Sequence, residues 1–286
     1  MEGSAGAGGL TLGTAFGYLL ALVALVVAPI YGGLLIVALL LRHLLPVRLG
    51  LVTTTVVTVS ATFLIDPGVR VIAESAGRVP LPGCRKADRD ETFGRLEPVS
   101  PLYCVFHRHY VTPQARAVVI DAARRFGVTE EGGMEPAGAM VRFLDAGLPL
   151  PLPLPPHISH GDGRKVDLAL VYRDASGPVA DSPSPIGYWH FEEPRPSDPR
   201  PCAGRGDWLT MRWDMRWLPL GDTALELDEV RTAKLVRLLT ADPRVTKILL
   251  EPHLVTRLGV AHPKVRFQGC RAARHDDHIH IEVAPN

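Results

Sequence analysis

A long apolar segment at the N-terminus constrains the fold of this chain more than any other feature of its sequence. No charged residue occurs between Glu2 and Arg42, and residues 15–41 form a run of apolar and small residues interrupted only by Pro29 and the pair Gly32-Gly33. At about 1.5 Å per helical residue, this run is longer than the roughly 30 Å core of a bilayer. A second uncharged run covers residues 49–65 and is near the lower limit for a spanning helix. The sequence therefore predicts an N-terminal transmembrane helical hairpin within residues 1–66.

The short connection between the two runs sets the expected orientation of the hairpin. It carries Arg42, His43 and Arg48, and the positive-inside rule places such a connection in the cytoplasm. With two spans, everything after Asp66 lies on the periplasmic side of the bacterial inner membrane, and membrane lipid surrounds the helices. If residues 49–65 are instead a buried strand or an interfacial helix, the rest of the chain is cytoplasmic. A cleaved signal peptide is disfavoured, because the first run lacks a positive leading region.

Charge and cysteine content narrow the class of protein. The net charge is +1, so there is no basic excess of the kind that binds nucleic acid. The four cysteines, all after residue 66, are Cys84, Cys104, Cys202 and Cys270. None forms a CxxC pair, so a cysteine zinc cage is disfavoured, and disulfides are expected if the domain is exported. Three pairings are possible and the sequence does not choose among them; isolated buried thiols are the alternative.

After residue 66, the sequence indicates an irregular tether over residues 67–111 and a folded domain over residues 112–286. Thr112 and Pro113 are typical of the start of a helix, and Gly127 of its end. A second helix is expected over residues 226–239, with an apolar face marked by Leu227, Val230, Leu235 and Leu238.

Strands are expected over residues 140–144, 166–172, 245–250 and 278–283, and a long loop over residues 174–207. Because helices and strands alternate without a repeated βαβ period, the predicted class is α+β. The expected architecture is a small, mainly antiparallel sheet with flanking helices and long loops.

Two histidine-rich segments contain the residues that we expect to form a metal site. The first runs from His157 through His160 to Asp167, and the second contains His275, His278 and His280. His278 and His280 are two residues apart in a β-branched segment, so on a strand both imidazoles share one face while Ile279 and Ile281 enter the core. Gly161 and Gly163 allow a tight turn that brings His160 and Asp167 together. Two histidines and one aspartate make a zinc site with an open position for water.

These segments resemble those of the penicillin-insensitive murein endopeptidases, which share the fold of the zinc D-Ala-D-Ala metallopeptidases and lysostaphin-type enzymes. The resemblance rests on Ser159-His160, Gly163 and Asp167, and on the HxxHxH pattern that ends at His280. It extends to Ala241-Asp-Pro-Arg-Val-Thr-Lys-Ile-Leu-Leu and to Lys264-Val-Arg, and covers about half of the chain, residues 150–284. Residues 66–140 show no counterpart, and the family is usually secreted without a retained anchor.

The resemblance implies that His160, Asp167 and His280 bind one zinc ion, with His275 and His278 as non-ligand active-site residues. One would be the general base and the other would stabilise the oxyanion; we assign the base to His275, with the reverse as the alternative. His157 corresponds to a histidine that can hold a second metal in the family, but it has no evident partners here, and a second zinc is not expected. Asp276 and Asp277 are interpreted as solvated turn acids, with a role in orienting an imidazole as the alternative.

Another motif, Trp189-His190, resembles the Trp-His ligand motif of related D,D-peptidases. The glutamate that precedes it in those enzymes is absent, with Ile186 and Gly187 in that neighbourhood, so His280 is preferred over His190 as the third ligand. Trp189, Trp208, Trp213 and Trp217 either line a substrate groove or, more commonly for tryptophan, pack in the core.

The sequence thus predicts a membrane-anchored zinc metallopeptidase that hydrolyses D-Ala-containing bonds in peptidoglycan peptide stems or crosslinks. The alternatives are a D,D-carboxypeptidase of the same fold and a non-catalytic zinc- or muropeptide-binding module of a membrane sensor. The bond cleaved, the oligomeric state and any protein partner are left open.

Overall fold

The core of the domain is a six-stranded sheet in the order β10-β9-β11-β5-β4-β2. The structure, a computed structural model, describes residues 12–27, 29–44, 67–85, 95–204 and 224–285. Neighbouring strands are antiparallel at the three central pairs, β9–β11, β11–β5 and β5–β4, and parallel at the two edge pairs. The predicted α+β class is therefore confirmed. The strands are β2 (Leu96–Pro98), β4 (Val141–Phe143), β5 (Lys165–Ala169), β9 (Val245–Leu249), β10 (Val265–Arg266) and β11 (His278–Val283).

Helix α5 (Pro113–Phe126) packs against α6 (Glu229–Ala241) and contacts β11, while α6 contacts β9 and α7 (Pro252–Leu258). The predicted start of α5 is confirmed: the side chain of Thr112 accepts a hydrogen bond from the backbone N–H of Ala115 at 3.3 Å, with Pro113 in the first turn. Apolar side chains of α5 and α6 are buried, so these two helices close the hydrophobic core on one side of the sheet.

The start and the apolar face of α6 differ from the prediction. Residues 226 and 227 form strand β8 (Glu226–Leu227), and Asp228 caps the helix by accepting from the N–H of Arg231 at 3.0 Å. Val230 is 78% exposed, so it is not part of the buried face. Because the Asp228 carboxylate satisfies a free backbone N–H group of the first turn, the helix begins there. Its buried face includes Leu235, Val236 and Leu239.

The segment expected to be an irregular tether contributes to the folded domain. Residues 67–75 are helical, β1 (Val79–Pro80) pairs with β3 (Tyr110–Val111), and β2 is an edge strand of the main sheet. A short helix, α4 (Leu102–Val105), follows β2. The main sheet therefore begins before residue 112.

The strand expected over residues 166–172 is divided into β5 and β6 (Tyr172–Asp174). Strand β6 pairs with β7 (Gly177–Val179) on one side and with β8 on the other, forming a separate three-stranded sheet. The chain then continues without regular structure to residue 204, as the proline-rich composition predicts.

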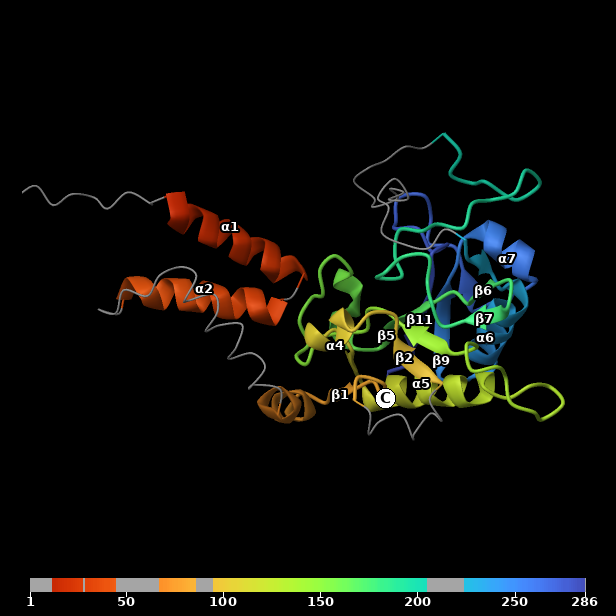
Figure 1. Cartoon of the computed structure of the whole chain (residues 1–286), viewed down its shortest axis with the longest axis horizontal. Helices are drawn as coiled ribbons and strands as arrows, with labels where there is room; N and C mark the ends of the chain where they lie inside the picture. The colour runs from red at the N-terminus through yellow and green to blue at the C-terminus, as the bar shows by residue number, and fades with distance from the viewer. Residues whose placement is uncertain (1–11, 28, 45–66, 86–94, 205–223, 286) are drawn as a thin grey trace, which may run out of the picture.

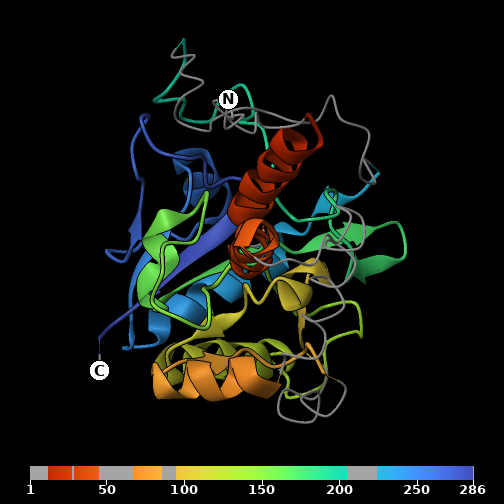
Figure 2. The same cartoon turned by 90° about the vertical axis from the view of Figure 1, so that its left-hand side faces the viewer.

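The predicted transmembrane hairpin is wrong. The apolar run forms two helices of 16 residues each, α1 (Leu12–Val27) and α2 (Pro29–Leu44), which lie side by side at the edge of the domain (Figures 1 and 2). Proline lacks an N–H group, so Pro29 cannot continue α1 and begins α2 instead. At Gly32 the helices approach closely, because a β-carbon there would lie 2.2 Å from the backbone nitrogen of Leu25.

Within the described residues, no helix is both long and apolar enough to cross a membrane. The second predicted span, residues 49–65, lies outside the described residues.

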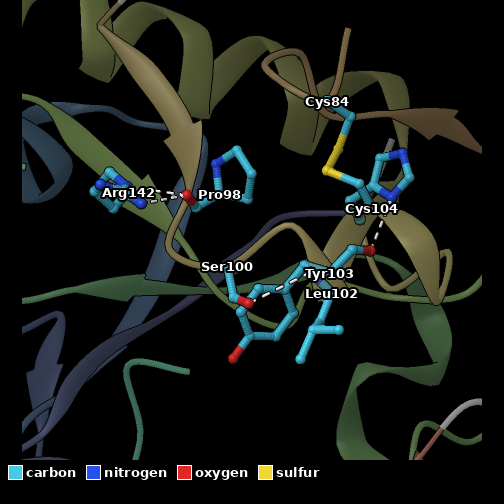
Figure 3. Close-up of a disulfide and its surroundings, with 8 residues drawn as sticks. Cys84, Pro98, Ser100, Leu102, Tyr103, Cys104 and Arg142 are labelled. Carbon is cyan, nitrogen blue, oxygen red and sulfur yellow. Dashed lines mark hydrogen bonds between the residues drawn. A yellow bond between two sulfur atoms is a disulfide. The ribbon is translucent and has the colours of Figure 1, made fainter. Parts of the chain in front are cut away.

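The four cysteines form two disulfides, Cys84–Cys104 and Cys202–Cys270, which confirms the expectation of disulfides and resolves their pairing. The first joins the segment after β1 to helix α4 (Figure 3). In the same region, the Arg142 guanidinium donates to the carbonyl oxygen of Pro98 at 2.6 Å. Helix α4, which has only four residues, is thus joined covalently to the segment after β1.

Candidate metal centre

The site is built on the antiparallel pair β5–β11. Asp167 lies directly opposite His280, and Leu168 lies opposite Ile279. Side chains alternate between the two faces of a strand, so Ile279 and Ile281 are fully buried in the core while His278 and His280 occupy the other face. The arrangement predicted for this strand is therefore present in the structure.

Asp167 is at the centre of the cluster, and the imidazoles converge on one of its oxygens. Oδ1 lies 2.7 Å from Nδ1 of His280, 3.5 Å from Nε2 of His160 and 3.8 Å from Nε2 of His278. Oδ2 accepts a hydrogen bond from the Tyr188 hydroxyl at 2.6 Å. Burial alone would raise the pKa of Asp167, but the surrounding histidines hold that pKa well below its usual value. Asp167 is therefore an anion throughout the neutral range.

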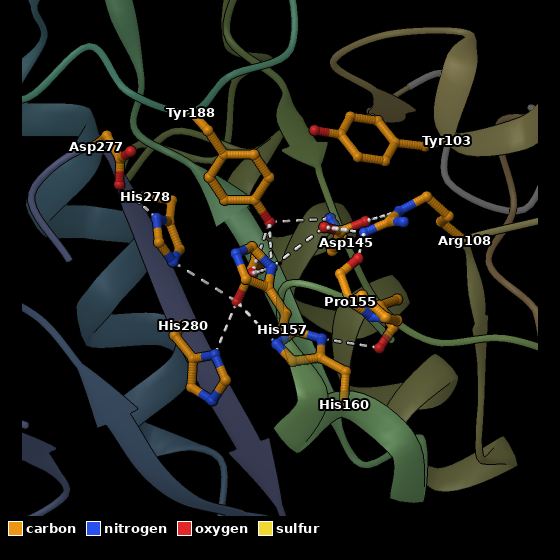
Figure 4. A network of polar contacts seen from close by, with 12 residues as sticks. Tyr103, Arg108, Asp145, Pro155, His157, His160, Tyr188, Asp277, His278 and His280 are labelled. Carbon is orange, nitrogen blue, oxygen red and sulfur yellow. Dashed lines mark hydrogen bonds and ion pairs between the residues drawn. The ribbon is translucent and has the colours of Figure 1, made fainter. Parts of the chain in front are cut away.

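A turn and a backbone carbonyl set the orientation of His160. The residue lies in a short 3-10 helix (Ile158–Asp162) that ends at Gly163, whose φ of 67° lies in the left-handed region. The Nδ1 atom of His160 donates to the carbonyl oxygen of Ala146 at 2.8 Å (Figure 4). With its proton on Nδ1, the ring presents the lone pair of Nε2 to Asp167 and the cluster. Glycine at 163 and the Ala146 carbonyl thus position one ligand atom.

His157 lies between two carboxylates. Its Nδ1 is 3.1 Å from Oδ2 of Asp145 and 3.2 Å from Oδ2 of Asp167 (Figure 4). Asp145 in turn receives two bonds from the Arg108 guanidinium, at 2.5 and 2.8 Å. Burial opposes protonation of His157, yet hydrogen bonds to the two carboxylates raise the pKa of His157 to about 10. Its Nδ1 is consequently a hydrogen-bond donor to both carboxylates.

The structure identifies a group that can hold a metal ion: His157, His160 and Asp167, whose ligand atoms lie within 4.8 Å of one another. It shares two members with the set implied by the motif resemblance. His280, the third member of that set, touches the same Asp167 oxygen, and burial lowers the pKa of His280 to about 4, which leaves its ring neutral at pH 7. Neutral imidazole and carboxylate are the donors that zinc, copper and nickel prefer.

His275 and His278 lie beside this group in different environments. The ring centre of His275 is 5.0 Å from that of His278 and 5.6 Å from that of His280. Burial, together with the neighbouring histidines, lowers the pKa of His275 well below its usual value. Burial would also lower the pKa of His278, but Asp167 and Asp277 raise it. The two imidazoles therefore differ in their affinity for a proton, as an acid–base pair requires.

The interpretation of Asp276 and Asp277 as solvated turn acids is wrong, because both side chains are buried. Oδ1 of Asp277 lies 2.5 Å from Nδ1 of His278, and its Oδ2 accepts from the backbone N–H of Trp189 at 2.6 Å. Asp277 thus orients an imidazole, which is the alternative that the sequence left open. Asp276 instead pairs with the Arg274 guanidinium at 2.5 Å.

Sequence reasoning missed Arg108, Asp145 and Tyr188, which surround His157 and Asp167. None belongs to a recognisable motif, although Tyr188 directly precedes the Trp-His motif. Pairing of β4 with β5 brings Asp145 to the site: the N–H of Asp167 donates to the carbonyl oxygen of Asp145, and the N–H of Leu144 to that of Asp167, both at 2.8 Å. His190 lines a separate cavity of about 620 Å³.

A cavity of about 340 Å³ adjoins the cluster and includes His157, His278 and Trp189 in its lining. Trp189 is half-buried there, whereas Trp208, Trp213 and Trp217 lie outside the described residues. Compared with known proteins, the sequence matches no family model and no curated protein.

Proposed function

We propose that the protein is a zinc-dependent metallopeptidase that hydrolyses peptide bonds in peptidoglycan, with D-Ala-containing crosslinks as the expected substrate. The observation that carries the proposal is the convergence of His160 and His280 on Oδ1 of Asp167. His278 lies beside them and is oriented by the carboxylate of Asp277. The peptidoglycan substrate rests on the resemblance of the two histidine motifs to the murein endopeptidases.

The proposed zinc ligands are His160, Asp167 and His280. Burial opposes protonation of His157, but its Nδ1 lies between the carboxylates of Asp145 and Asp167, and hydrogen bonds to both raise the pKa of His157 to about 10. Because a protonated imidazole does not bind a metal, we place His157 outside the ligand set. It acts instead as an outer residue that fixes Oδ2 of Asp167, together with Tyr188. Such partners hold a ligating carboxylate in one orientation and leave its other oxygen to the metal.

When bound, zinc supplies Lewis-acid polarisation of the scissile carbonyl and activation of a water molecule. The protein's own residues supply the proton transfers. His275 accepts a proton from the attacking water and returns it to the leaving amine, because its ring is neutral and its centre lies 5.6 Å from that of His280. His278 stabilises the oxyanion, since Asp277 binds its Nδ1 and leaves Nε2 to face the cluster. The reverse assignment of these two histidines remains the alternative.

An extracytoplasmic location is part of the proposal. Two disulfides that use all four cysteines are typical of proteins that fold in an oxidising compartment. Peptidoglycan lies in such a compartment, so the site and its substrate would meet there.

The test is digestion of purified crosslinked sacculi by the full chain, with added zinc or with a chelator, followed by analysis of the muropeptides. Zinc-dependent loss of crosslinked dimers supports an endopeptidase. His160→Ala should abolish this activity, whereas His262→Ala, which changes an exposed histidine away from the cluster, should preserve it. Release of free D-Ala with intact dimers assigns the protein to the D,D-carboxypeptidases. No product from zinc-loaded protein contradicts the proposal and favours the muropeptide-binding module.

A further inference from the structure

Arg78 lies outside both histidine motifs, yet its side chain reaches the turn that carries His160, residues 158–163. Its Nη2 donates to the carbonyl oxygen of Gly161 at 2.7 Å. Only 3% of Arg78 is exposed. Burial lowers the pKa of Arg78, and the charge of Asp162 in the same turn opposes this shift. The guanidinium is therefore buried against the backbone of the turn and is attracted by its one carboxylate.

The backbone on either side of Arg78 is fixed. Residues 67–75 are helical, and Gly77 follows them with a φ of 69°, in the left-handed region that glycine adopts without strain. The N–H of Arg78 then donates to the carbonyl oxygen of Ala73 at 2.8 Å, which closes the end of the helix. Val79, the next residue, begins β1, which pairs with β3. The side chain of Arg78 thus extends to the turn from a backbone that is held on both sides.

The turn accommodates the guanidinium because residue 163 has no side chain. A β-carbon at Gly163 would lie 1.1 Å from Nη1 of Arg78 and 2.3 Å from its Cζ. Gly163 also has a φ of 67°, which other residues rarely adopt. Glycine at this position therefore serves two purposes, the backbone conformation of the turn and the space for Arg78.

The contact of Arg78 is one residue away from a proposed zinc ligand. Gly161, whose carbonyl accepts from Arg78, directly follows His160. The ring of His160 is oriented by the carbonyl of Ala146, and its Nε2 lies 3.5 Å from Oδ1 of Asp167. Ligand atoms have to be held within about 0.5 Å of the productive geometry. Arg78 holds the backbone of the turn, while the Ala146 carbonyl holds the ring.

A purely stabilising role does not account for this arginine. Its Nη1 is buried and has no hydrogen-bond partner in the part of the chain that the structure describes. Burying a charged group with an unsatisfied donor costs free energy. Local arrangements that are unfavourable by themselves are found at functional sites, where the surrounding structure offsets them.

We propose that Arg78 is a positioning residue of the metal centre, which holds the turn so that His160 presents Nε2 to the metal ion. The inference rests on the proposed function, because it takes His160 as a zinc ligand. His160 also belongs to the group formed with His157 and Asp167, so the inference is the same for either ligand set. It extends the metal-binding unit to a segment that precedes both histidine motifs.

The test is the zinc affinity of the full chain, measured by competition with a chromophoric chelator. Arg78→Met should weaken zinc binding about 10-fold or more, as loss of an outer partner does. Arg78→Lys keeps the charge and a donor but not the planar group, so it should lose less affinity. Arg116→Met is the matched control, because Nε of Arg116 donates to a backbone carbonyl in the same segment, that of Pro80, at 3.0 Å. It should leave zinc affinity unchanged.

A double-mutant cycle shows whether Arg78 acts through His160. In a His160→Ala background, Arg78→Met should cause no further loss of zinc affinity, because the turn no longer carries a ligand. An equal loss in both backgrounds, or wild-type affinity in Arg78→Met, would overturn the proposal. Circular dichroism checks that each variant folds. If Arg78→Met does not fold, the cycle uses Arg78→Lys, for which wild-type affinity is the contradicting result.

Sacculus digestion separates failure of this inference from failure of the proposed function. If sacculi are cleaved and Arg78→Met binds zinc as tightly as the wild type, only the role of Arg78 is wrong. If Arg78→Met weakens zinc binding through His160 but the wild type leaves sacculi intact, the role of Arg78 stands and the substrate of the proposed function is wrong.

Discussion

Asp167 and His280 face each other directly across strands β5 and β11, and Oδ1 of Asp167 lies 2.7 Å from Nδ1 of His280. Because both residues are on regular strands in the middle of the sheet, their separation is fixed by backbone hydrogen bonds and by the buried Ile279 and Ile281 that flank His280. Sites carried by regular elements hold ligand geometry better than sites carried by loops. This pair is the rigid half of the candidate centre, and His160 completes it from a turn.

The first prediction separates the two possible ligand sets. His280→Ala should weaken zinc binding by more than about 100-fold, because it removes a ligand, whereas loss of an outer partner costs about 10–100-fold. His157→Ala should weaken binding by only about 10-fold, since its contact is to Oδ2 of Asp167. Competition with a chromophoric chelator measures both constants. The opposite order would assign the metal to His157, His160 and Asp167.

A substitution of Tyr188 tests whether a residue that contacts a proposed ligand, and not the metal itself, supports metal binding. Tyr188→Phe removes the hydroxyl that donates to Oδ2 of Asp167 at 2.6 Å, so zinc affinity should fall about 10-fold. Tyr103→Phe is the control, because that hydroxyl bonds to the Ile186 carbonyl in the same cavity. It should leave zinc affinity unchanged. Equal effects of the two substitutions would mean that the Tyr188 hydroxyl does not support the carboxylate.

Asp277 should matter for turnover rather than for metal binding. Asp277→Asn replaces the carboxylate that holds Nδ1 of His278, and kcat on sacculi should fall about 10–100-fold with the zinc content retained. Glu282→Gln, on the same strand as His278, alters a carboxylate that contacts Lys247 at 2.5 Å and should keep kcat. Zinc lost from the Asp277 variant would show that this carboxylate supports the metal instead.

Much of the site could be predicted from local sequence because it depends on strand alternation. The spacing of His278 and His280 among isoleucines is sufficient to place both imidazoles on one face. The contribution of Asp145 and Tyr188 was not predictable in this way. Asp145 reaches His157 only because β4 pairs with β5, and Tyr188 comes from a loop without periodicity.

The N-terminal prediction failed for a physical reason of a different kind. Hydropathy measures how apolar a segment is, and residues 15–41 are apolar enough to be predicted as a membrane span. It does not measure whether one helix continues through the segment. Pro29 divides the run, and the glycine at residue 32 allows the two halves to pack together as a pair of shorter helices.

The two disulfides should contribute comparably to stability. Their sequence separations of 20 and 68 residues correspond, by loop entropy, to about 3 kcal/mol for Cys84–Cys104 and about 4 kcal/mol for Cys202–Cys270. Replacing each pair by serine and measuring urea denaturation tests this. A clearly larger loss of stability from the Cys84–Cys104 pair than from the Cys202–Cys270 pair would contradict the order given by loop length.

The buried Arg108–Asp145 pair should make stability depend on pH in acid. Burial opposes ionisation, but Arg108 and His157 lower the pKa of Asp145 from 3.8 to about 2. The carboxyl is therefore more acidic in the folded state, so its stabilising contribution is present above pH 3.8 and is lost as pH falls toward 2. The contribution at neutral pH is about 2 kcal/mol.

Urea denaturation of chelator-treated wild type and Asp145→Asn from pH 6 to pH 2 measures this contribution. At pH 6 the variant should be less stable by about 3–5 kcal/mol, because the buried Arg108 loses its ionic partner. The difference should shrink by about 2 kcal/mol toward pH 2. Asp121→Asn, whose half-exposed carboxylate contacts Arg244 at 2.6 Å, should change stability by less than about 1 kcal/mol. A difference for Asp145→Asn that does not change with pH would show that the pair does not shift the pKa of Asp145 on folding.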